Sequence, residues 1–356
     1  MHNRIQAALF AAALLLAGCA APATLAQAPF QPNGAPASFA PLVKRVVPAV
    51  VNISVIESGA DSVTIPRELR GTPAERMLRE RLRRRAVQGA GSGFIVDPSG
   101  IIVTNTHVVG RANRITVSLS DGRELPARLI GYDELTDIAV IRVAADGPLP
   151  TVPWGDSRTV EVGDWILAAG NPFGVGISVT AGIVSARGRD IGAGPFDDFL
   201  QIDAPINPGN SGGPTFNMNG EVIAVNTAIV SPTGGSVGIG FAIPSEIAMR
   251  IVDDLRTKGR IERGWLGVSV QEVGPRGTGV TVANVDRAGP AARAGLRQGD
   301  IVTAVNGQKV ETTQSLIRAV AAIAPGGSAR LTVRRGNGTV EVPVTVGRRP
   351  VEHQEE

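Results

Sequence analysis

The residue types best suited to nucleophilic chemistry lie in the segment NPGNSGGP, residues 207–214, which is flanked by apolar segments. Glycine adopts backbone angles that other residues avoid, and it lets another backbone come close. A nucleophilic serine needs a tight turn that exposes its hydroxyl, with backbone N–H groups free to bind an oxyanion. Gly209, Asn210 and Ser211 are therefore predicted to form a nucleophile turn with its oxyanion donors. The alternative is an ordinary glycine-rich loop.

A serine hydroxyl is a poor nucleophile unless a base removes its proton. The chain has three histidines, and two of them, His2 and His353, lie close to its ends. His107 follows the apolar segment IIVTN at residues 101–105. A lone histidine beside apolar residues is more often structural than catalytic. Because His107 is the one imidazole in the body of the chain, it is the candidate general base.

A catalytic histidine is usually oriented by a carboxylate. Asp137 opens the apolar segment DIAVIRV, residues 137–143, where an acidic residue is disfavoured unless it is paired. Asp137 is therefore the candidate orienting acid. Asp133, within the more polar YDE of residues 132–134, is the alternative, and its surroundings predict a solvated side chain.

The chain order His107, Asp137, Ser211 is that of the chymotrypsin-type triad. The segments that carry these residues, TNTHVV (104–109), DIAV (137–140) and GNSGGP (209–214), together with GNPFG (170–174), resemble the HtrA/Deg family of trypsin-like serine proteases. The resemblance covers residues 39–346. It implies a mainly β fold, with a chymotrypsin-like double six-stranded β-barrel and the triad at the seam between the barrels.

A second resemblance follows a predicted helix at residues 244–258, which Gly259 should end. The segments RGWLGV (263–268) and GPAARAGLRQGDIV (289–302) resemble one PDZ domain, an α+β module. Such a domain adds a peptide as an extra strand and binds its terminal carboxylate through backbone N–H groups. The resemblance implies a groove helix at 314–323 and a carboxylate-binding loop formed by Trp265, Leu266, Gly267 and Val268.

These resemblances divide the chain into successive segments. They are a signal peptide (1–19), a Pro/Gly-rich tether (20–38), a protease domain (39–245), a linker helix (246–262), the PDZ domain (263–347) and a polar tail (348–356).

The protease resemblance also predicts a specificity pocket. Pro205, six residues before the proposed nucleophile, would lie at its base beside Ile206, although the family more often has a small residue there. Asn226, Thr227 and Ala228 would form the opposite wall. None of these side chains is charged, so we expect cleavage after small aliphatic residues.

Composition agrees with a folded, two-domain protein and excludes several classes of function. The 356 residues are 43% hydrophobic, and 44 glycines and 25 prolines favour a β-rich, turn-rich body. A net charge of +3 does not argue for nucleic acid as a partner. One interior histidine and one cysteine argue against a zinc site, and there is no phosphate-binding Gly-Lys-Ser/Thr loop. No cofactor is expected. The glycine-rich segment 234–240 precedes a strand, so it is predicted to be a loop and not a dinucleotide site.

The first residues predict export. A basic start, MHNR, is followed by an apolar run at 7–16, shorter than a membrane span, and then by LAGC. This pattern resembles a bacterial lipoprotein signal with Cys19 as the lipidated residue. The alternative is an ordinary leader cleaved near residues 26–28. Either form predicts a periplasmic protein of a Gram-negative-type bacterium, anchored to a membrane by lipid or soluble.

Two further segments suggest contacts with other copies of the chain. In the family, the segment before the first strand packs trimer contacts, and Phe39 is the candidate here, or else a core residue. The arginine-rich segment 67–85 is either a solvated insertion or a regulatory loop that contacts a neighbouring subunit or an anionic surface.

The sequence therefore predicts a homotrimeric or larger serine endopeptidase of envelope quality control. It would cleave unfolded proteins through an acyl-enzyme, with a PDZ domain that recognises C-terminal peptides. The alternative is a latent, chaperone-like peptide-binding protein.

Overall fold

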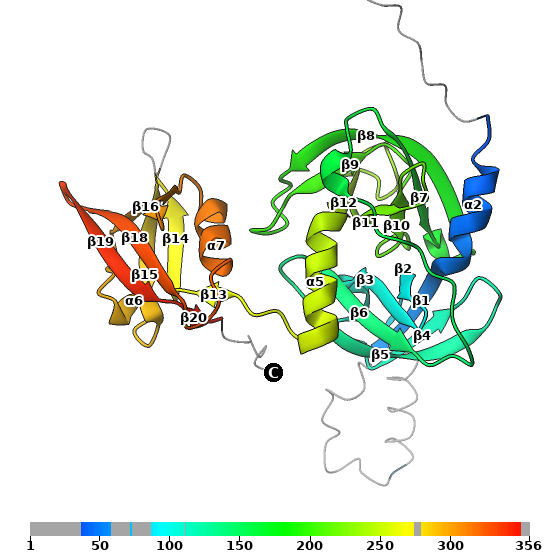
Figure 1. Cartoon of the computed structure of the whole chain (residues 1–356), viewed down its shortest axis with the longest axis horizontal. Helices are drawn as coiled ribbons and strands as arrows, with labels where there is room; N and C mark the ends of the chain where they lie inside the picture. Colours follow the sequence, from blue (N-terminus) through cyan, green and yellow to red (C-terminus); the bar gives the residue numbers. More distant parts are fainter. Residues whose placement is uncertain (1–36, 58–71, 73–86, 111, 274–278, 350–356) are drawn as a thin grey trace, which may run out of the picture. The chain divides into compact units, whose positions relative to one another are not determined.

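The computed structural model describes residues 37–57, 72, 87–110, 112–273 and 279–349 (Figure 1). The predicted signal peptide with Cys19, most of the tether, nearly all of the arginine-rich segment and most of the polar tail lie outside these residues. The described chain is mainly β, as predicted.

Six antiparallel strands close the first barrel in the order β1-β2-β3-β6-β5-β4. Their bounds are β1 Val50–Glu57, β2 Val87–Asp97, β3 Ile101–Asn105, β4 Arg114–Ser118, β5 Glu124–Asp133 and β6 Ile138–Val143. Strands β2 and β3 form a hairpin, joined by the turn at 98–100. All five residues of β3 are buried, and Ile102 belongs to the apolar core of the barrel. The strand is therefore a rigid support for whatever follows Asn105.

The second barrel repeats this plan in the order β10-β11-β12-β9-β8-β7. Its strands are β7 Trp165–Gly170, β8 Ser178–Arg189, β9 Phe199–Ile202, β10 Pro214–Phe216, β11 Val222–Ile229 and β12 Gly240–Pro244. A separate apolar cluster fills its interior, with Ile166, Ile202 and Ile223 among the fully buried side chains. Residues 231–239 carry no helix or strand, so the prediction of a glycine-rich loop there is confirmed.

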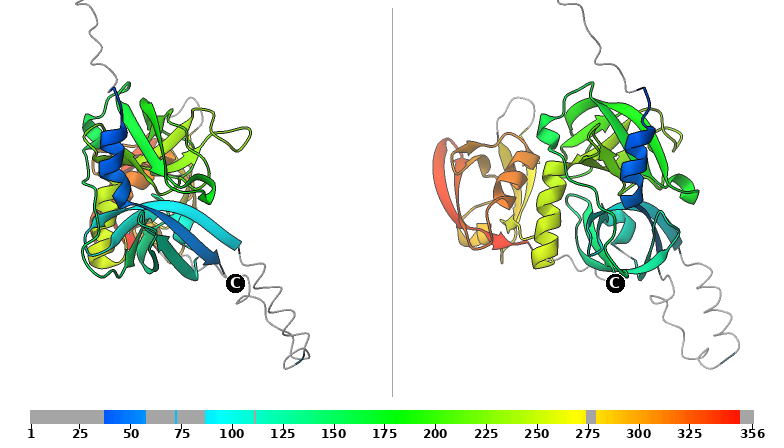
Figure 2. Two further views of the ribbon diagram at one scale, coloured as in Figure 1. Left: turned by 90° about the vertical axis from the view of Figure 1, so that its right-hand side faces the viewer. Right: turned by 45° about the vertical axis from the view of Figure 1, so that its right-hand side comes forward.

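Short helices accompany the barrels. They are α2 Ala40–Val46, η1 Val47–Ala49, α4 Thr106–Val109, η3 Ser157–Thr159 and η4 Pro172–Gly174. The long helix α5, Ser245–Lys258, confirms the predicted helix. Its buried residues Ala248, Ile251, Val252 and Leu255 form one apolar stripe that packs against strands of both barrels (Figures 1 and 2). Gly259 ends the helix in the left-handed conformation, with φ of 70°.

The C-terminal domain is built on a sheet whose main path is β14-β15-β16-β18-β19. Its strands are β14 Val268–Glu272, β15 Val280–Val285, β16 Ile301–Val305, β17 Gln308–Lys309, β18 Ser328–Arg335 and β19 Gly338–Thr345. The pair β13 Gly264–Trp265 and β20 Gly347–Arg348 brings the two ends of the domain together. Its helices are α6 Pro290–Arg293 and α7 Thr313–Ala321.

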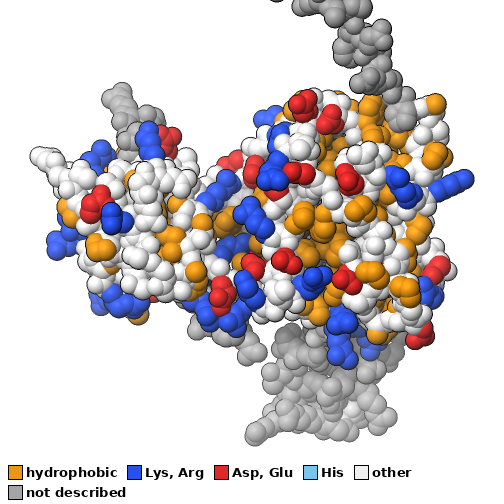
Figure 3. All heavy atoms as spheres, in the orientation of Figure 1, with side chains coloured by type: hydrophobic (Ala, Val, Ile, Leu, Met, Phe, Trp, Pro, Cys, Tyr) orange, Lys and Arg blue, Asp and Glu red, His pale blue; other side chains and the backbone are white. Residues whose placement is uncertain are grey.

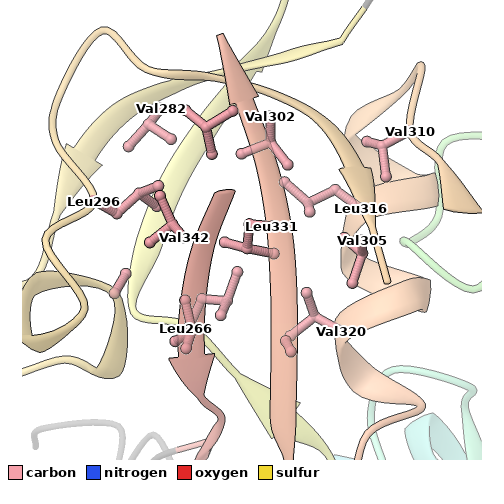
Figure 4. Packing of buried hydrophobic residues seen from close by; sticks show 14 of the residues in the cluster. Leu266, Val282, Leu296, Val302, Val305, Val310, Leu316, Val320, Leu331 and Val342 are labelled. Atoms are coloured by element: carbon pink, nitrogen blue, oxygen red, sulfur yellow. The ribbon is translucent and has the colours of Figure 1, made fainter. Parts of the chain in front are cut away.

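Helix α7 closes the core of this domain. Thr312 caps the helix through a reciprocal capping box with Ser315. Leu316 and Val320 on the helix face Leu331 and Val305 of the sheet (Figure 4). The helix predicted at 314–323 is present as α7, residues 313–321, and it packs on the apolar core of its own domain.

Acidic, basic and apolar side chains are interspersed on the face shown in Figure 3, and apolar side chains gather over the two barrels. Among the described residues, no helix has both the length and the apolar character needed to cross a bilayer.

Candidate active site

His107 is held beside Asp137 at the end of the first barrel. It is the second residue of α4, which begins directly after the buried strand β3. Nδ1 of His107 donates to Oδ2 of Asp137 at 2.7 Å, and the backbone N–H of His107 donates to Oδ1 at 3.0 Å. One carboxylate therefore fixes both the position of the residue and the direction of its ring. The His107 side chain is 49% exposed and that of Asp137 26%, so the remaining ring nitrogen is accessible.

Asp137 lies in the turn between β5 and β6, with a left-handed φ of 57°. Its carbonyl accepts the N–H of Thr106 at 3.2 Å and Nδ2 of Asn105 at 2.8 Å. Aspartate tolerates this conformation better than most residues. The surrounding hydrogen bonds hold the backbone in this conformation, which turns the carboxylate toward His107.

The alternative acid, Asp133, has another role, and the prediction that it is solvated was wrong. Its side chain is 6% exposed and forms a bidentate ion pair with Arg263, with Nη2 to Oδ2 at 2.7 Å. The same carboxylate accepts the N–H of Thr136 at 3.1 Å. Asp133 thus supports the turn that leads to Asp137.

Ser211 lies in a tight glycine turn. Gly209 and Gly212 have φ of 103° and 83°, a region that favours glycine. A Cβ on Gly212 would lie 2.3 Å from the carbonyl oxygen of Ser92 and from Oγ1 of Thr104. The first barrel therefore approaches this turn too closely for any side chain at residue 212.

Thr227 connects Ser211 to the residues around His107. The ladder between β11 and β12 shifts register between Asn226 and Ala228, which leaves a bulge at Thr227. Its carbonyl accepts the hydroxyl of Ser211 at 3.3 Å, and its own Oγ1 accepts Nδ2 of Asn105 at 2.7 Å. Within the described chain no hydrogen bond joins Ser211 to His107, because the Ser211 hydroxyl points to Thr227.

The backbone N–H groups of Gly209 and Ser211 donate to no acceptor within the part of the chain that the structure describes. Both are therefore free to bind an oxyanion. The N–H of Asn210, which was also predicted to take part, is already donated to the carbonyl of Asn207 at 3.0 Å. The Asn210 N–H stabilises the turn, so two of the three predicted oxyanion donors remain, the N–H groups of Gly209 and Ser211.

A cavity of about 310 Å³ adjoins the catalytic candidates, and His107, Asp137, Thr227 and Ala228 are among its lining residues. The other predicted pocket residues lie elsewhere. Ile206 is 2% exposed and belongs to the core of the second barrel.

Asn226 is fully buried, with its amide bound to Thr215 and to the carbonyl of Ala169. Pro205 is exposed. Of the predicted pocket residues, Thr227 and Ala228 line this cavity and Pro205 does not, while Ile206 and Asn226 have no exposed surface to offer a substrate.

In the C-terminal domain, the predicted carboxylate-binding loop joins β13 to β14. Gly267 has φ of 75°, and the N–H groups of Leu266 and Gly267 have no acceptor among the described residues. The Leu266 side chain is 4% exposed and lies in the domain core. Trp265 is half-buried, and its ring would lie 3.0 Å from a Cβ on Gly267. Val268 begins β14. The backbone of this loop is thus available to a ligand, whereas Leu266 anchors it.

Three contributors to this geometry were missed at the level of sequence. Arg263 stands 130 positions from Asp133, and no local pattern connects them. Asn105 occurs in the segments IIVTN and TNTHVV, but neither pattern indicates its contacts with Asp137 and Thr227. Ser92 contacts the Ser211 turn, and its position between Gly91 and Gly93 is the one local sign that another backbone passes close by.

Two parts of the chain match known protein families. Residues 91–225 match the family described as trypsin-like peptidase domain, and residues 264–346 match the PDZ domain. A probable periplasmic serine endoprotease, DegP-like, of Brucella suis biovar 1 is 53% identical over 270 residues, covering 73% of this chain and 53% of that protein. A DegP-like relative of Pseudomonas savastanoi pv. phaseolicola is 42% identical over 347 residues, covering 89% of this chain and 72% of that protein.

Solved structures of serine proteases are also similar to this chain. The HtrA-type protease AlgW with a decapeptide superposes with a TM-score of 0.75 at 36% identity, covering 88% of this chain and 99% of that chain. The serine endoprotease from Yersinia pestis has a TM-score of 0.70 at 34% identity, covering 89% of this chain and 100% of that chain. The chain spans about half the length of the Brucella relatives it matches. With a trypsin-like peptidase domain of two six-stranded barrels followed by a PDZ domain, the chain belongs to the HtrA family of DegP-like serine endoproteases.

Proposed function

We propose that this chain is a serine endopeptidase in which Ser211 is the nucleophile, His107 the general base and Asp137 the orienting acid. The observation that carries the proposal is the carboxylate of Asp137, which binds both Nδ1 and the backbone N–H of His107. An ionised carboxylate only accepts hydrogen bonds, so Nδ1 carries the proton and Nε2 is left as the base. This is the tautomer that proton abstraction from a serine requires.

The reaction then proceeds in two halves. The Ser211 hydroxyl turns from Thr227 to His107, Nε2 takes its proton, and Oγ bonds to the peptide carbonyl carbon. The carbonyl electrons move to the oxygen, which the N–H groups of Gly209 and Ser211 bind. When the intermediate collapses, the C–N bond breaks and His107 returns the proton to the leaving amine. Water repeats the sequence on the acyl-enzyme, again with His107 as base.

The direct test is cleavage of casein by the wild type and by Ser211→Ala. We expect cleavage by the wild type alone, since the residual rate without a triad member is lower by several orders of magnitude. Equal cleavage by both would refute the assignment of Ser211. Labelling by a fluorophosphonate, which reacts with activated serines, gives a second readout that needs no knowledge of the substrate.

We infer the substrate class from the predicted pocket residues that have exposed surface. Pro205, Thr227 and Ala228 carry no charge, so we propose cleavage after small aliphatic residues of unfolded proteins. Digestion of a peptide library, read by mass spectrometry, checks this. A dominant preference for Arg or Lys before the cleaved bond would overturn it.

The unpaired N–H groups of Leu266 and Gly267 support recognition of a C-terminal carboxylate by the PDZ domain. Free-acid and amidated forms of one peptide, compared by calorimetry, test this, and equal affinities would contradict it. The same peptides in the casein assay show whether this ligand activates the enzyme.

We further propose a periplasmic location, in line with the names of the periplasmic relatives. A homotrimeric or larger assembly and a lipid anchor on Cys19 are proposed from the sequence resemblances alone. Membrane fractionation of wild type and Cys19→Ala tests the anchor, and a mass measurement of the purified protein tests the assembly. Release of the variant from the membrane is expected; identical fractions would leave ordinary leader cleavage as the explanation.

The second candidate, a latent peptide-binding protein, is favoured by one observation, the Ser211 hydroxyl bound to Thr227 instead of His107. In that case neither casein cleavage nor fluorophosphonate labelling would be detected, while the PDZ domain would still bind C-terminal peptides.

A further inference from the structure

We propose that Ser92 is a positioning residue for the oxyanion site, an inference that rests on the proposed function. Ser92 lies on β2 of the first barrel and is fully buried. Its hydroxyl donates to the carbonyl of Gly209 at 2.7 Å and accepts the N–H of Asn171 at 2.8 Å. One hydroxyl of the first barrel therefore holds two loops of the second.

The Gly209 carbonyl is the group whose placement matters. Gly209 also carries one of the two free N–H groups, and its φ of 103° lies in a region that glycine enters and leaves readily. This carbonyl lies in the peptide plane shared with Asn210, and the Gly209 N–H lies in the preceding plane, to which it is related by the dihedral angles of Gly209. The hydrogen bond from Ser92 fixes the carbonyl plane and the Cα of Gly209, so it limits how far the preceding plane and its N–H can rotate before the substrate arrives. Such preorganisation is the main source of oxyanion stabilisation.

The backbone of Ser92 extends the same control to the triad. Its N–H donates to the carbonyl of Ser211 at 2.8 Å, and its own carbonyl accepts Oγ1 of Thr104 at 2.7 Å. Thr104 lies on β3, three residues before His107. A short path of hydrogen bonds thus runs from the strand that precedes the base, through Ser92, to the turn that carries the nucleophile.

Close packing leaves this junction little freedom. A Cβ on Gly170 would lie 3.0 Å from Oγ of Ser92 and 2.7 Å from Oδ1 of Asn210. The neighbouring loops therefore fit around the serine side chain, and a replacement without the hydroxyl leaves the Gly209 carbonyl and the Asn171 N–H without their partner. Two unpaired buried groups favour local rearrangement of the loops.

The chain contains a matched control for the structural cost of losing such a hydroxyl. Ser245 is also fully buried; its hydroxyl donates to the carbonyl of Gly155 at 2.7 Å and accepts the N–H of Ser157 at 3.1 Å. It has the same type of partners as Ser92 and no contact with the Ser211 turn. Ser92→Ala and Ser245→Ala should therefore lower the melting temperature to a similar extent.

The test compares these variants with the wild type in steady-state peptide hydrolysis. Loss of a whole oxyanion donor lowers kcat about 100- to 1,000-fold, so a donor that is present but less well directed should cost at least about 10-fold. We expect this fall in kcat for Ser92→Ala with KM within about 2-fold, and little change for Ser245→Ala. A peptide boronic acid, whose tetrahedral adduct occupies the oxyanion site, should bind Ser92→Ala more weakly by a similar factor.

Equal kcat for the two variants, or a change confined to KM, would overturn the inference and leave the endopeptidase proposal intact. A wild type without Ser211-dependent cleavage would overturn both. If Ser92→Ala does not fold, Ser92→Cys, which keeps the volume but donates weakly, is measured in its place with the same two outcomes.

Discussion

The ion pair between Arg263 and Asp133 gives the sharpest prediction of stability. Its side chains are 11% and 6% exposed, so both charges have left water and depend on each other. Arg263 also lies over the ring of Phe196, with its guanidinium carbon 4.7 Å from the centroid. Replacing Arg263 by methionine removes the charge and keeps much of the volume, and it leaves the Asp133 carboxylate buried without a cation.

Removal of one partner from a buried pair costs about 3–5 kcal/mol. Here Asp133 keeps the N–H and hydroxyl of Thr136 as donors, so we expect the lower limit, about 3 kcal/mol. For a domain of about 200 residues, 1 kcal/mol shifts the melting temperature by about 2–4 °C, so Arg263→Met should melt about 6–12 °C below the wild type. Differential scanning calorimetry of the full chain measures this shift.

Two further variants show whether the charge is the cause. Asp133→Asn retains an acceptor for Thr136 but no charge, so the double variant with Arg263→Met should cost clearly less than the sum of the single variants. Arg260→Met removes an exposed partner of Glu262 from the same linker and should leave the melting temperature nearly unchanged. Additive single variants, or a shift for Arg263→Met no larger than that for Arg260→Met, would refute the reasoning.

Three other predictions follow from single contacts. Gly212→Ala should abolish cleavage and lower the melting temperature far more than Gly122→Ala. Both glycines have positive φ, but of the two only Gly212 has atoms within 2.3 Å of a new Cβ. Equal shifts in melting temperature would contradict this. Asn105→Ala should lower kcat with little effect on KM, because its amide links Asp137 to Thr227; a change in KM alone would contradict it. Hydrogen bonds from Arg335 hold the pKa of the Asp300 carboxyl below its usual value. The ionised Asp300 therefore stabilises the folded domain at pH values above its unfolded pKa of about 3.9, and this stabilisation is lost as the pH falls through the lower folded pKa. Hydrogen exchange in β16 and β18 should therefore show Asp300→Asn less stable by about 2 kcal/mol at neutral pH, with this gap closing in acid; a gap that is constant with pH would refute the assignment.

The part of this architecture that could be predicted from sequence is the part encoded by neighbouring residues. Strand and helix positions followed from apolar runs and turn residues, and the segments around His107, Asp137 and Ser211 each carried a local pattern. The structure brings these three segments to one place through Asn105 and Thr227, as their chain order suggested.

What could not be predicted depends on partners that are distant in sequence. The polar sequence neighbours of Asp133 indicated a solvated acid. No nearby residue in the sequence indicates that the guanidinium of Arg263 pairs with it. The burial of Ile206 and Asn226 depends on closure of the second barrel. Once the barrel is closed, the Ile206 side chain lies in its core and the Asn226 amide binds Thr215. Whether Asn210 or Gly209 has a free N–H likewise depends on the conformation of the turn and not on its composition.

The left-handed backbone at Asp137 has a consequence for how this chemistry can be lost. Residue 137 must satisfy two separate demands, a strained dihedral angle and a negative charge. Asparagine meets the first and not the second, whereas glutamate meets the second and not the first. The shortest mutational route to a catalytically silent protein thus keeps every strand in place, and such a protein would bind polypeptides without cutting them.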